Sequence, residues 1–327
     1  MLHLRLIVPS DRTDEVVRLI ESTVGTTHLV VLPGAARDPA GDVVTCDVAR
    51  EAGDGLLSRL QELGIDHSGS IAVDDIGLSL SRRADRAEEE APGEGADAVL
   101  WEHLVEATHE ESTLSVTYVA FLTIATMIAA CGVVLDNAVL IVGAMAVGPE
   151  FGPLAGISTA LVRRKPRLAA RSLLALVVGF AVAMALTVGF SVLMDAAGLF
   201  SEAKLEGDRP NTGFVYAPDA FSFVVALLAG AAGTLSLTSA KSGALVGVAI
   251  SVTTVPAAAN AAVALAYGDT AQTVGSSEQL LLNLFGIVVA GVLTLLAQKA
   301  FWARKGRKSG TGGTGGKGTN GAKAEAA

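Results

Sequence analysis

Apolar residues form short, alternating runs before residue 80 of this 327-residue chain and long runs after residue 114. In the first part, the runs LHLRLIVP, THLVVLPG, GDVVTCDVA and IDHSGSIAVDDIGLSL predict strands, because their apolar residues alternate or lie between turn residues. Two segments carry apolar residues at helical spacing and predict helices. DEVVRLIEST follows Ser10, a suitable N-cap, and DGLLSRLQEL (residues 54–63) ends at Gly64. This order predicts an α+β, ferredoxin-like cytoplasmic domain over residues 1–80.

Residues 81–98, SRRADRAEEEAPGEGADA, are charged and poor in large apolar side chains, which predicts a flexible linker. Residues 99–114 resume helical spacing and predict an amphipathic collar helix, with Trp101 suited to the membrane interface. Residues 303–327 are rich in Gly, Thr and Lys, which predicts a disordered tail.

The apolar runs between residues 115 and 302 predict an α-helical, multi-pass membrane domain. Six spans are expected, at about 115–134, 137–162, 168–194, 220–238, 243–267 and 279–302. Basic residues follow the second, fourth and sixth spans, at 163–171, at Lys241 and at 299–308, whereas acidic residues such as Glu202 and Asp208 occupy the opposite connections. By the positive-inside rule both termini are cytoplasmic. Since no signal-peptide core is present at the start, the front of the chain is expected to stay in the cytoplasm. The predicted location is the inner membrane.

Composition removes several function classes. The formal net charge of −9 gives no electrostatic footprint for nucleic-acid binding. Cys46 and Cys131 form no CxxC or Cys/His metal pattern, and no Walker or Rossmann glycine loop is present. The sequence therefore names no cofactor and predicts a protein that is not an enzyme.

The second span contains the candidate site. Its middle, Gly148-Pro149-Glu150-Phe151-Gly152-Pro153, places two prolines and a carboxylate in a segment that is otherwise apolar. Each proline removes a backbone donor, so a helix break is expected here. Such a break survives in a bilayer only inside protein or beside water, and a glutamate there is expected to be functional. The alternative is a Pro-kinked helix with a neutral, hydrogen-bonded Glu150.

The fifth span repeats this feature. It is interrupted at Pro256, after Thr253 and Thr254 and before Asn260. Broken spans at corresponding places in two three-span halves are typical of inverted-repeat transporters with a midplane site. The sequence thus predicts a 3+3 inverted repeat, and the alternative is two ordinary proline kinks.

The stretch HEESTLSVTYVAFLTIATMIAACGVVLDNAVLIVGAMAVGPEFGPLAGISTALV and the later SGALVGVAISVTTVPAAANAAVAL resemble the bacterial membrane proteins called "domain of unknown function 389". With the last span they cover most of residues 101–302. Many members have a second proline where this chain has Ala257. The resemblance implies a membrane architecture, often with a small soluble N-terminal domain, and no assigned activity.

These observations favour a membrane transport protein, either an ion channel or a secondary carrier, with its pathway between the second and fifth spans. Glu150 would bind a cation or proton, while backbone carbonyls freed near Gly148 and the Thr253, Thr254 and Asn260 side chains would supply neutral ligands. Expected partners are membrane lipid, further copies of the chain in a homo-oligomer, and a small anionic metabolite or nucleotide at the cytoplasmic domain. The alternative is a membrane-embedded sensor or scaffold that conducts nothing.

Overall fold

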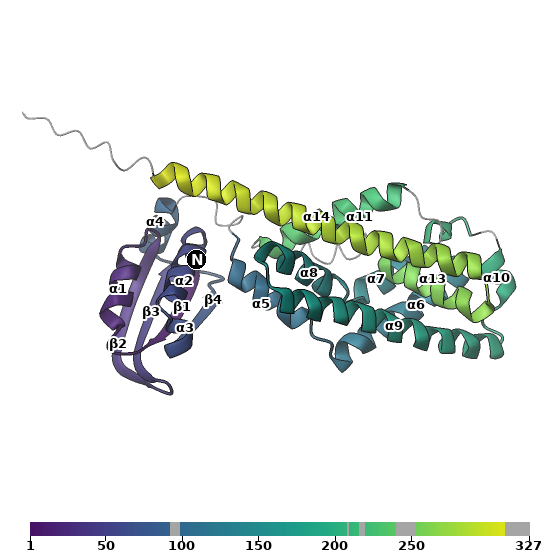
Figure 1. The fold of residues 1–327 in the computed structure, drawn as a ribbon, viewed down its shortest axis with the longest axis horizontal. Helices are drawn as coiled ribbons and strands as arrows, with labels where there is room; N and C mark the ends of the chain where they lie inside the picture. Colours follow the sequence, from purple (N-terminus) through teal and green to yellow (C-terminus); the bar gives the residue numbers. More distant parts are fainter. Residues whose placement is uncertain (92–98, 208, 216–219, 240–252, 311–327) are drawn as a thin grey trace, which may run out of the picture.

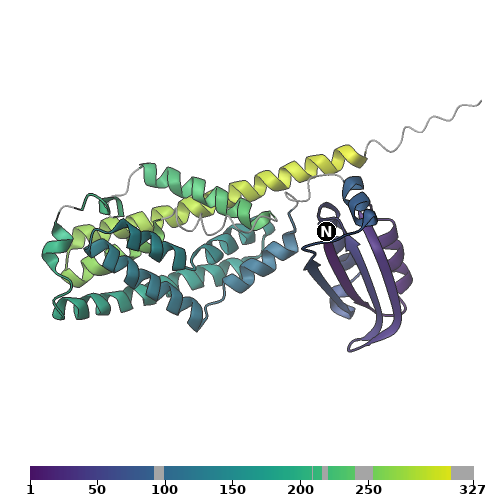
Figure 2. The same ribbon diagram turned by 180° about the vertical axis from the view of Figure 1, so that it is seen from behind.

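The computed structural model describes residues 1–91, 99–207, 209–215, 220–239 and 253–310, and only the backbone for residues 206, 214 and 303–310. The chain forms a small N-terminal domain built on a sheet and an elongated bundle of helices (Figure 1). The N-terminus and the last described turns of the final helix lie at the same end of the bundle, beside the N-terminal domain. The view from behind shows the same arrangement (Figure 2).

The N-terminal domain is a four-stranded antiparallel sheet with the strand order β2-β3-β1-β4. Its elements are β1 (Leu2–Val8), α1 (Thr13–Glu21), β2 (Thr26–Arg37), β3 (Ala40–Val48), α2 (Arg50–Glu62), α3 (Ile65–Ser68) and β4 (Ser70–Asp75). Because side chains alternate along a strand, Leu2, Leu4 and Leu6 of β1 all point into one core, where they meet Leu56 and Leu60 of α2. The strands and helices predicted before residue 65 are present. Residues 65–68, which were predicted as part of the last strand, form α3 instead, and β4 covers only Ser70–Asp75.

Helix α4 (Arg82–Glu90) occupies much of the segment predicted as a flexible linker. The Ser81 hydroxyl caps it by accepting hydrogen bonds from the backbone N–H groups of Arg83 and Ala84, at 3.3 and 3.4 Å. Ala84 and Ala87 are buried. A helix forms in this segment although it lacks large apolar side chains. Alanine is the best helix former, and its small side chain lets α4 lie close to the domain.

Among its described residues, the bundle has four helices long and apolar enough to cross a membrane: α6 (Val116–Val134), α9 (Pro166–Ala196), α11 (Ala220–Thr238) and the Thr270–Trp302 part of α14 (Thr270–Gly310). A bent pair, α7 (Ala138–Val147) and α8 (Phe151–Arg163), makes five if it is counted as one span. Shorter elements are α10 (Glu202–Glu206), η2 (Gly213–Val215) and α13 (Thr254–Tyr267). Six spans are not confirmed, since the predicted fifth span falls partly on residues 240–252. Residues 240–252, which include Lys241, lie outside the described residues, and so does Asp208.

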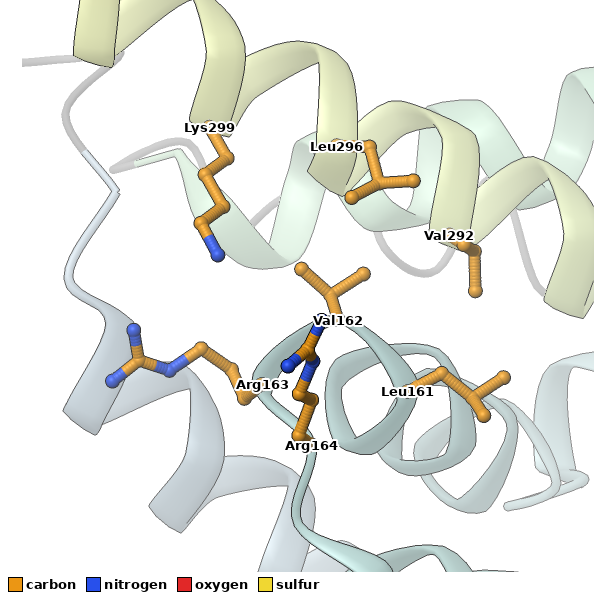
Figure 3. Close-up of a pocket in the computed structure, with 7 residues that line it drawn as sticks. All are labelled: Leu161, Val162, Arg163, Arg164, Val292, Leu296 and Lys299. Carbon is orange, nitrogen blue, oxygen red and sulfur yellow. The ribbon is translucent and has the colours of Figure 1, made fainter.

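Helix α5 (Trp101–Glu111) connects the N-terminal domain to the bundle. The backbone N–H of Trp101 donates to Asp54 of the domain at 3.2 Å, and Glu102 forms an ion pair with Arg163 at 3.0 Å. The guanidinium of Arg163 also lies 5.5 Å from the centre of the Trp101 ring. The predicted collar helix therefore packs along α8. The end of α8 in turn faces α14 across a pocket lined partly by cations (Figure 3).

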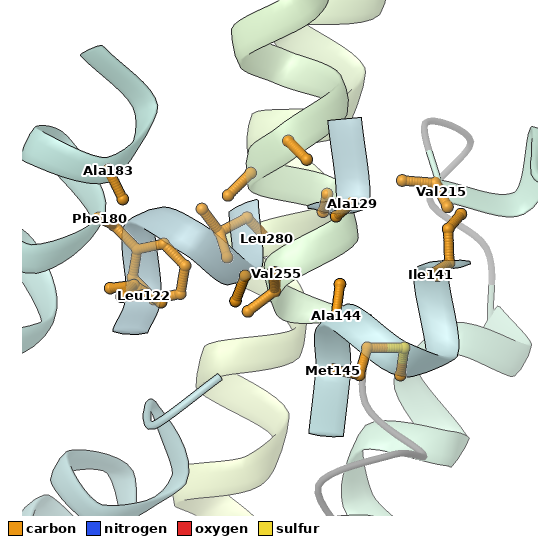
Figure 4. Packing of buried hydrophobic residues seen from close by; sticks show 14 of the residues in the cluster. Leu122, Ala129, Ile141, Ala144, Met145, Phe180, Ala183, Val215, Val255 and Leu280 are labelled. Atoms are coloured by element: carbon orange, nitrogen blue, oxygen red, sulfur yellow. The ribbon is translucent and has the colours of Figure 1, made fainter. Parts of the chain in front are cut away.

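Small residues let the helices of the bundle approach closely. Helix α13 is buried at every position from Thr254 to Ala264, because α6, α7, α9 and α14 pack around it. Residues from these helices and from η2 form one apolar cluster, and Figure 4 labels Leu122, Ala129, Ile141, Ala144, Met145, Phe180, Ala183, Val215, Val255 and Leu280 in it. This packing surrounds the bend between α7 and α8 and the start of α13.

Candidate functional site

Helices α7 and α8 are bent by 53° at the motif predicted to break the second span. Gly148, at the end of α7, has the extended conformation that a residue before proline prefers (φ −65°, ψ 128°), and Pro149 then stops the helix. Pro153 is the third residue of α8, where no intrahelical bond needs its missing N–H. Of the two prolines expected to break the span, only Pro149 does so.

Helix α13 begins in the same way as α8. Thr253 precedes its first residue and Pro256 is its third, just as Glu150 precedes α8 and Pro153 is the third residue there. Residues 150–153 and 253–256 thus place a proline at the same position of two helix starts, although Glu150 (φ −70°, ψ −18°) and Thr253 (φ −82°, ψ 44°) differ in backbone conformation.

The two helices leave this point in opposite directions. The last turn of α8 packs on α14 near its C-terminal end, where Val162 meets Leu295. The last residue of α13, Tyr267, donates its hydroxyl to Asp195 at the C-terminal end of α9, 3.1 Å away at the other end of the bundle. Two half-length helices therefore start near the middle of the bundle with their N-termini in contact.

Glu150 joins the two helix starts. Its side chain is only 5% exposed, and Oε1 accepts a hydrogen bond of 2.7 Å from the Thr254 hydroxyl. The other oxygen, Oε2, is buried and has no hydrogen-bond donor among the described residues. The carboxylate folds back over Gly148, where any Cβ would collide with Oε2. A buried carboxylate oxygen without a donor is costly, so a proton, a cation or a water molecule is needed to satisfy it.

Two further ionisable side chains lie near the start of α8. The buried Tyr118 hydroxyl has no partner among the described residues and is close enough to interact electrostatically with Glu150. The Glu111 carboxylate of α5 packs against Gly152 in the first turn of α8. Burial, and then the charge of Glu110, raises the pKa of Glu111. The start of α8 thus has a glutamate on each side, one inside the bundle and one at its edge.

Asn260 lies in a different cluster from Glu150. Its Oδ1 accepts from Arg209 at 2.9 Å, and its Nδ2 donates to Ser276 at 2.7 Å. Six residues separate it from Thr254, which corresponds to about 9 Å along a helix. Asn260 is therefore not a direct neighbour of the Glu150 carboxylate. Its partner Arg209 is a buried cation that the sequence pattern did not indicate.

A polar stripe on α14 links these two clusters; we use this name for Gln272, Ser276, Gln279 and Asn283. Gln272 accepts from Arg209 at 2.5 Å, and Gln279 donates to Asn283 at 3.4 Å. Asn283 in turn donates to Thr253 at 2.8 Å, next to the residue that binds Glu150. Ser276, Gln279 and Asn283 are almost fully buried. The spacing of 4, 3 and 4 residues between these polar side chains is the signal in the sequence that marks the stripe.

The described helices define an α-helical protein with several segments able to cross a membrane. Residues 145–289 match the model of the family described as "Domain of unknown function (DUF389)", which confirms the resemblance inferred from the motifs. The matched segment runs from the last turn of α7 to the middle of α14, and so it includes both helix starts and the polar stripe.

An uncharacterized protein of Methanocaldococcus jannaschii is 26% identical to this chain over 210 residues. The alignment covers 64% of this chain and 63% of that relative. No solved structure matches the chain significantly. Among the described residues, no group of three or more His, Cys, Asp and Glu side chains is placed to hold a metal ion.

Proposed function

We propose that this protein transports a cation or protons across a membrane, with Glu150 as the charged group of the transport site. One observation carries the proposal. Within the part of the chain that the structure describes, the buried Glu150 carboxylate accepts one hydrogen bond, from the other half-helix, and keeps its second oxygen without a donor. A cation or a proton at Oε2 would satisfy it, and the sites of many transporters lie at such discontinuous helices.

The proposal includes the finer architecture predicted from the sequence: six spans arranged as a 3+3 inverted repeat, and a ferredoxin-like N-terminal domain. The equivalent prolines at the third positions of α8 and α13 support the repeat. The opposite directions of these two helices support its inversion, because an odd number of spans per half reverses the second half.

The polar stripe would form the route between Glu150 and the end of the bundle where Arg209 lies. In a background without Cys46 and Cys131, Ser276→Cys is expected to react with a small membrane-impermeant thiol reagent, because water would reach it along this route. Leu281→Cys is the matched control, since Leu281 is 65% exposed on the same helix and would face lipid. Equal protection of both cysteines from the reagent would argue against the route.

Cysteine labelling on intact cells tests the inner-membrane orientation. Helices α10, which contains Glu202, and α3, which contains Asp66, lie at opposite ends of the molecule (Figure 1). Glu202→Cys is expected to react with an impermeant reagent, whereas Asp66→Cys reacts only after cell lysis, because the basic side of the membrane domain should be cytoplasmic. The reverse pattern would overturn the orientation in which both termini are cytoplasmic.

The remaining parts of the proposal concern partners. We propose a homo-oligomer in membrane lipid, regulated by a small anionic metabolite or nucleotide at the N-terminal domain, and without enzymatic activity. A small-ligand domain would bias gating by preferring one conformation.

The function is tested with purified full-length protein in liposomes, by following proton and monovalent-cation flux with entrapped fluorescent indicators. Flux above that of empty liposomes, with a dependence on pH, is expected. If the folded protein conducts neither protons nor these cations, the alternative of a membrane-embedded sensor or scaffold is favoured.

A further inference from the structure

A pocket of about 470 Å³ lies between the end of α8 and α14, at the end of the bundle next to the N-terminal domain. Figure 3 shows cationic and apolar side chains on its two walls. It is lined by Leu161, Val162, Arg163, Arg164, Val292, Leu296 and Lys299. None of these described lining residues carries a carboxylate.

The local backbone explains why the cations gather here. Arg164 follows α8 in the left-handed conformation (φ 55°, ψ 43°), so the helix stops and the chain turns at the pocket. Arg163 is held by Glu102 and by the Trp101 ring. Neither Arg164 nor Lys299 forms an ion pair with any described residue, and both side chains are exposed. Two cations therefore remain available to an anionic ligand.

The apolar wall and its position identify the kind of ligand. Leu161 and Leu296 are 55% and 45% exposed, which continues the apolar surface of the bundle up to the cations. On α14, residues 279–298 contain no charged residue, and Lys299 ends this stretch. Twenty residues of helix span about 30 Å, the thickness of the hydrocarbon core of a bilayer. The cations thus lie where an apolar slab ends, at the level of lipid head groups.

We propose that this pocket binds the head group of an anionic phospholipid, with the phosphate between Arg164 and Lys299 and the acyl chains along Leu161 and Leu296. Basic pockets between membrane helices bind anionic head groups in this way. A free phosphate would use the cations but not the exposed leucines. The bound lipid would connect α14 to the far end of α8, the half-helix that begins at Glu150. The proposal does not depend on whether the protein transports anything.

The test uses the full-length protein in an uncharged detergent. Dioleoyl phosphatidylglycerol, dioleoyl phosphatidylcholine and inorganic phosphate are added separately. Thermal unfolding is followed by tryptophan fluorescence, and retained lipid by native mass spectrometry. Phosphatidylglycerol is expected to raise the melting temperature and to remain bound, because a ligand that binds only the folded state stabilises it. Phosphatidylcholine and inorganic phosphate should do neither.

The double variant Arg164→Gln/Lys299→Gln is expected to bind phosphatidylglycerol about 30-fold more weakly, since each cation near a head group contributes roughly 1 kcal/mol. Both side chains are exposed, so the fold should survive. Arg82→Gln/Arg86→Gln removes the same charge from the exposed face of α4 and should bind like the wild type. Unchanged lipid binding by the first variant would overturn the site. Stabilisation by inorganic phosphate alone would overturn the assignment to lipid.

Discussion

Glu150→Gln is expected to lower ion flux by at least about tenfold and to remove its pH dependence, without unfolding the protein. The amide keeps an oxygen to accept the hydrogen bond from Thr254, and it occupies the same space over Gly148. It carries no charge and does not titrate. The variant therefore loses the stronger interaction that a charged carboxylate makes with the transported cation or proton. A hydrogen bond to a charged group contributes roughly 1.5–3 kcal/mol, and the loss of a contribution of this size corresponds to about ten- to a hundredfold in rate. Flux from liposomes over a range of pH measures the effect.

Glu278→Gln is the matched control for this variant, because Glu278 is an exposed carboxylate on α14 outside the polar stripe. Its flux and pH profile should resemble those of the wild type. If Glu150→Gln itself keeps wild-type flux with an unchanged pH profile, Glu150 is a neutral, hydrogen-bonded core residue and the transport role assigned to it is wrong.

Gly230→Leu is expected to destabilise the bundle strongly. Helices α11 and α14 touch at this residue, where a Cβ would lie 2.7 Å from the carbonyl oxygen of Ile287 and 2.8 Å from its Cα. Backbone atoms cannot swing aside as a flexible side chain can, so the two helices must separate. Overpacking of this kind costs roughly 1–3 kcal/mol or more, and we expect the melting temperature in detergent to fall by roughly 5–10 °C.

Gly189→Leu makes the same substitution on α9, at a position where nothing lies within 4 Å of a new Cβ. Its melting temperature should stay close to that of the wild type, and could even rise because leucine favours a helix more than glycine does. Equal melting temperatures for the two variants would mean that α11 and α14 do not cross at Gly230.

Several features of this protein were predictable from local patterns. The alternation of Leu2, Leu4 and Leu6 predicted β1, and long apolar runs predicted the helices of the bundle, since both signals depend on neighbours in sequence. The break at Pro149 was predictable for the same reason, because proline acts on its own backbone and on the preceding residue.

Local patterns failed where the outcome depended on distant partners. Pro153 does not end a helix, because α8 starts only two residues earlier, at Phe151, and that start packs against α13. Helix α4 forms in a segment without large apolar side chains because small alanines pack against the N-terminal domain. Asn260 shared a broken span with Thr254, yet its amide bonds to Arg209, which lies 51 residues away in the chain.

The sequence by itself determined which segments are apolar, where α7 must stop, and that a glutamate lies in the break. Proline chemistry and hydrophobic periodicity act within a few residues, so no tertiary contact was needed to infer them. Only the tertiary structure decided that the starts of α8 and α13 meet, that Thr254 donates to Glu150 across 104 residues of chain, and that the polar stripe reaches Arg209. These contacts depend on how whole helices pack, because the free energy of burying a polar group is set by the partners that packing brings to it.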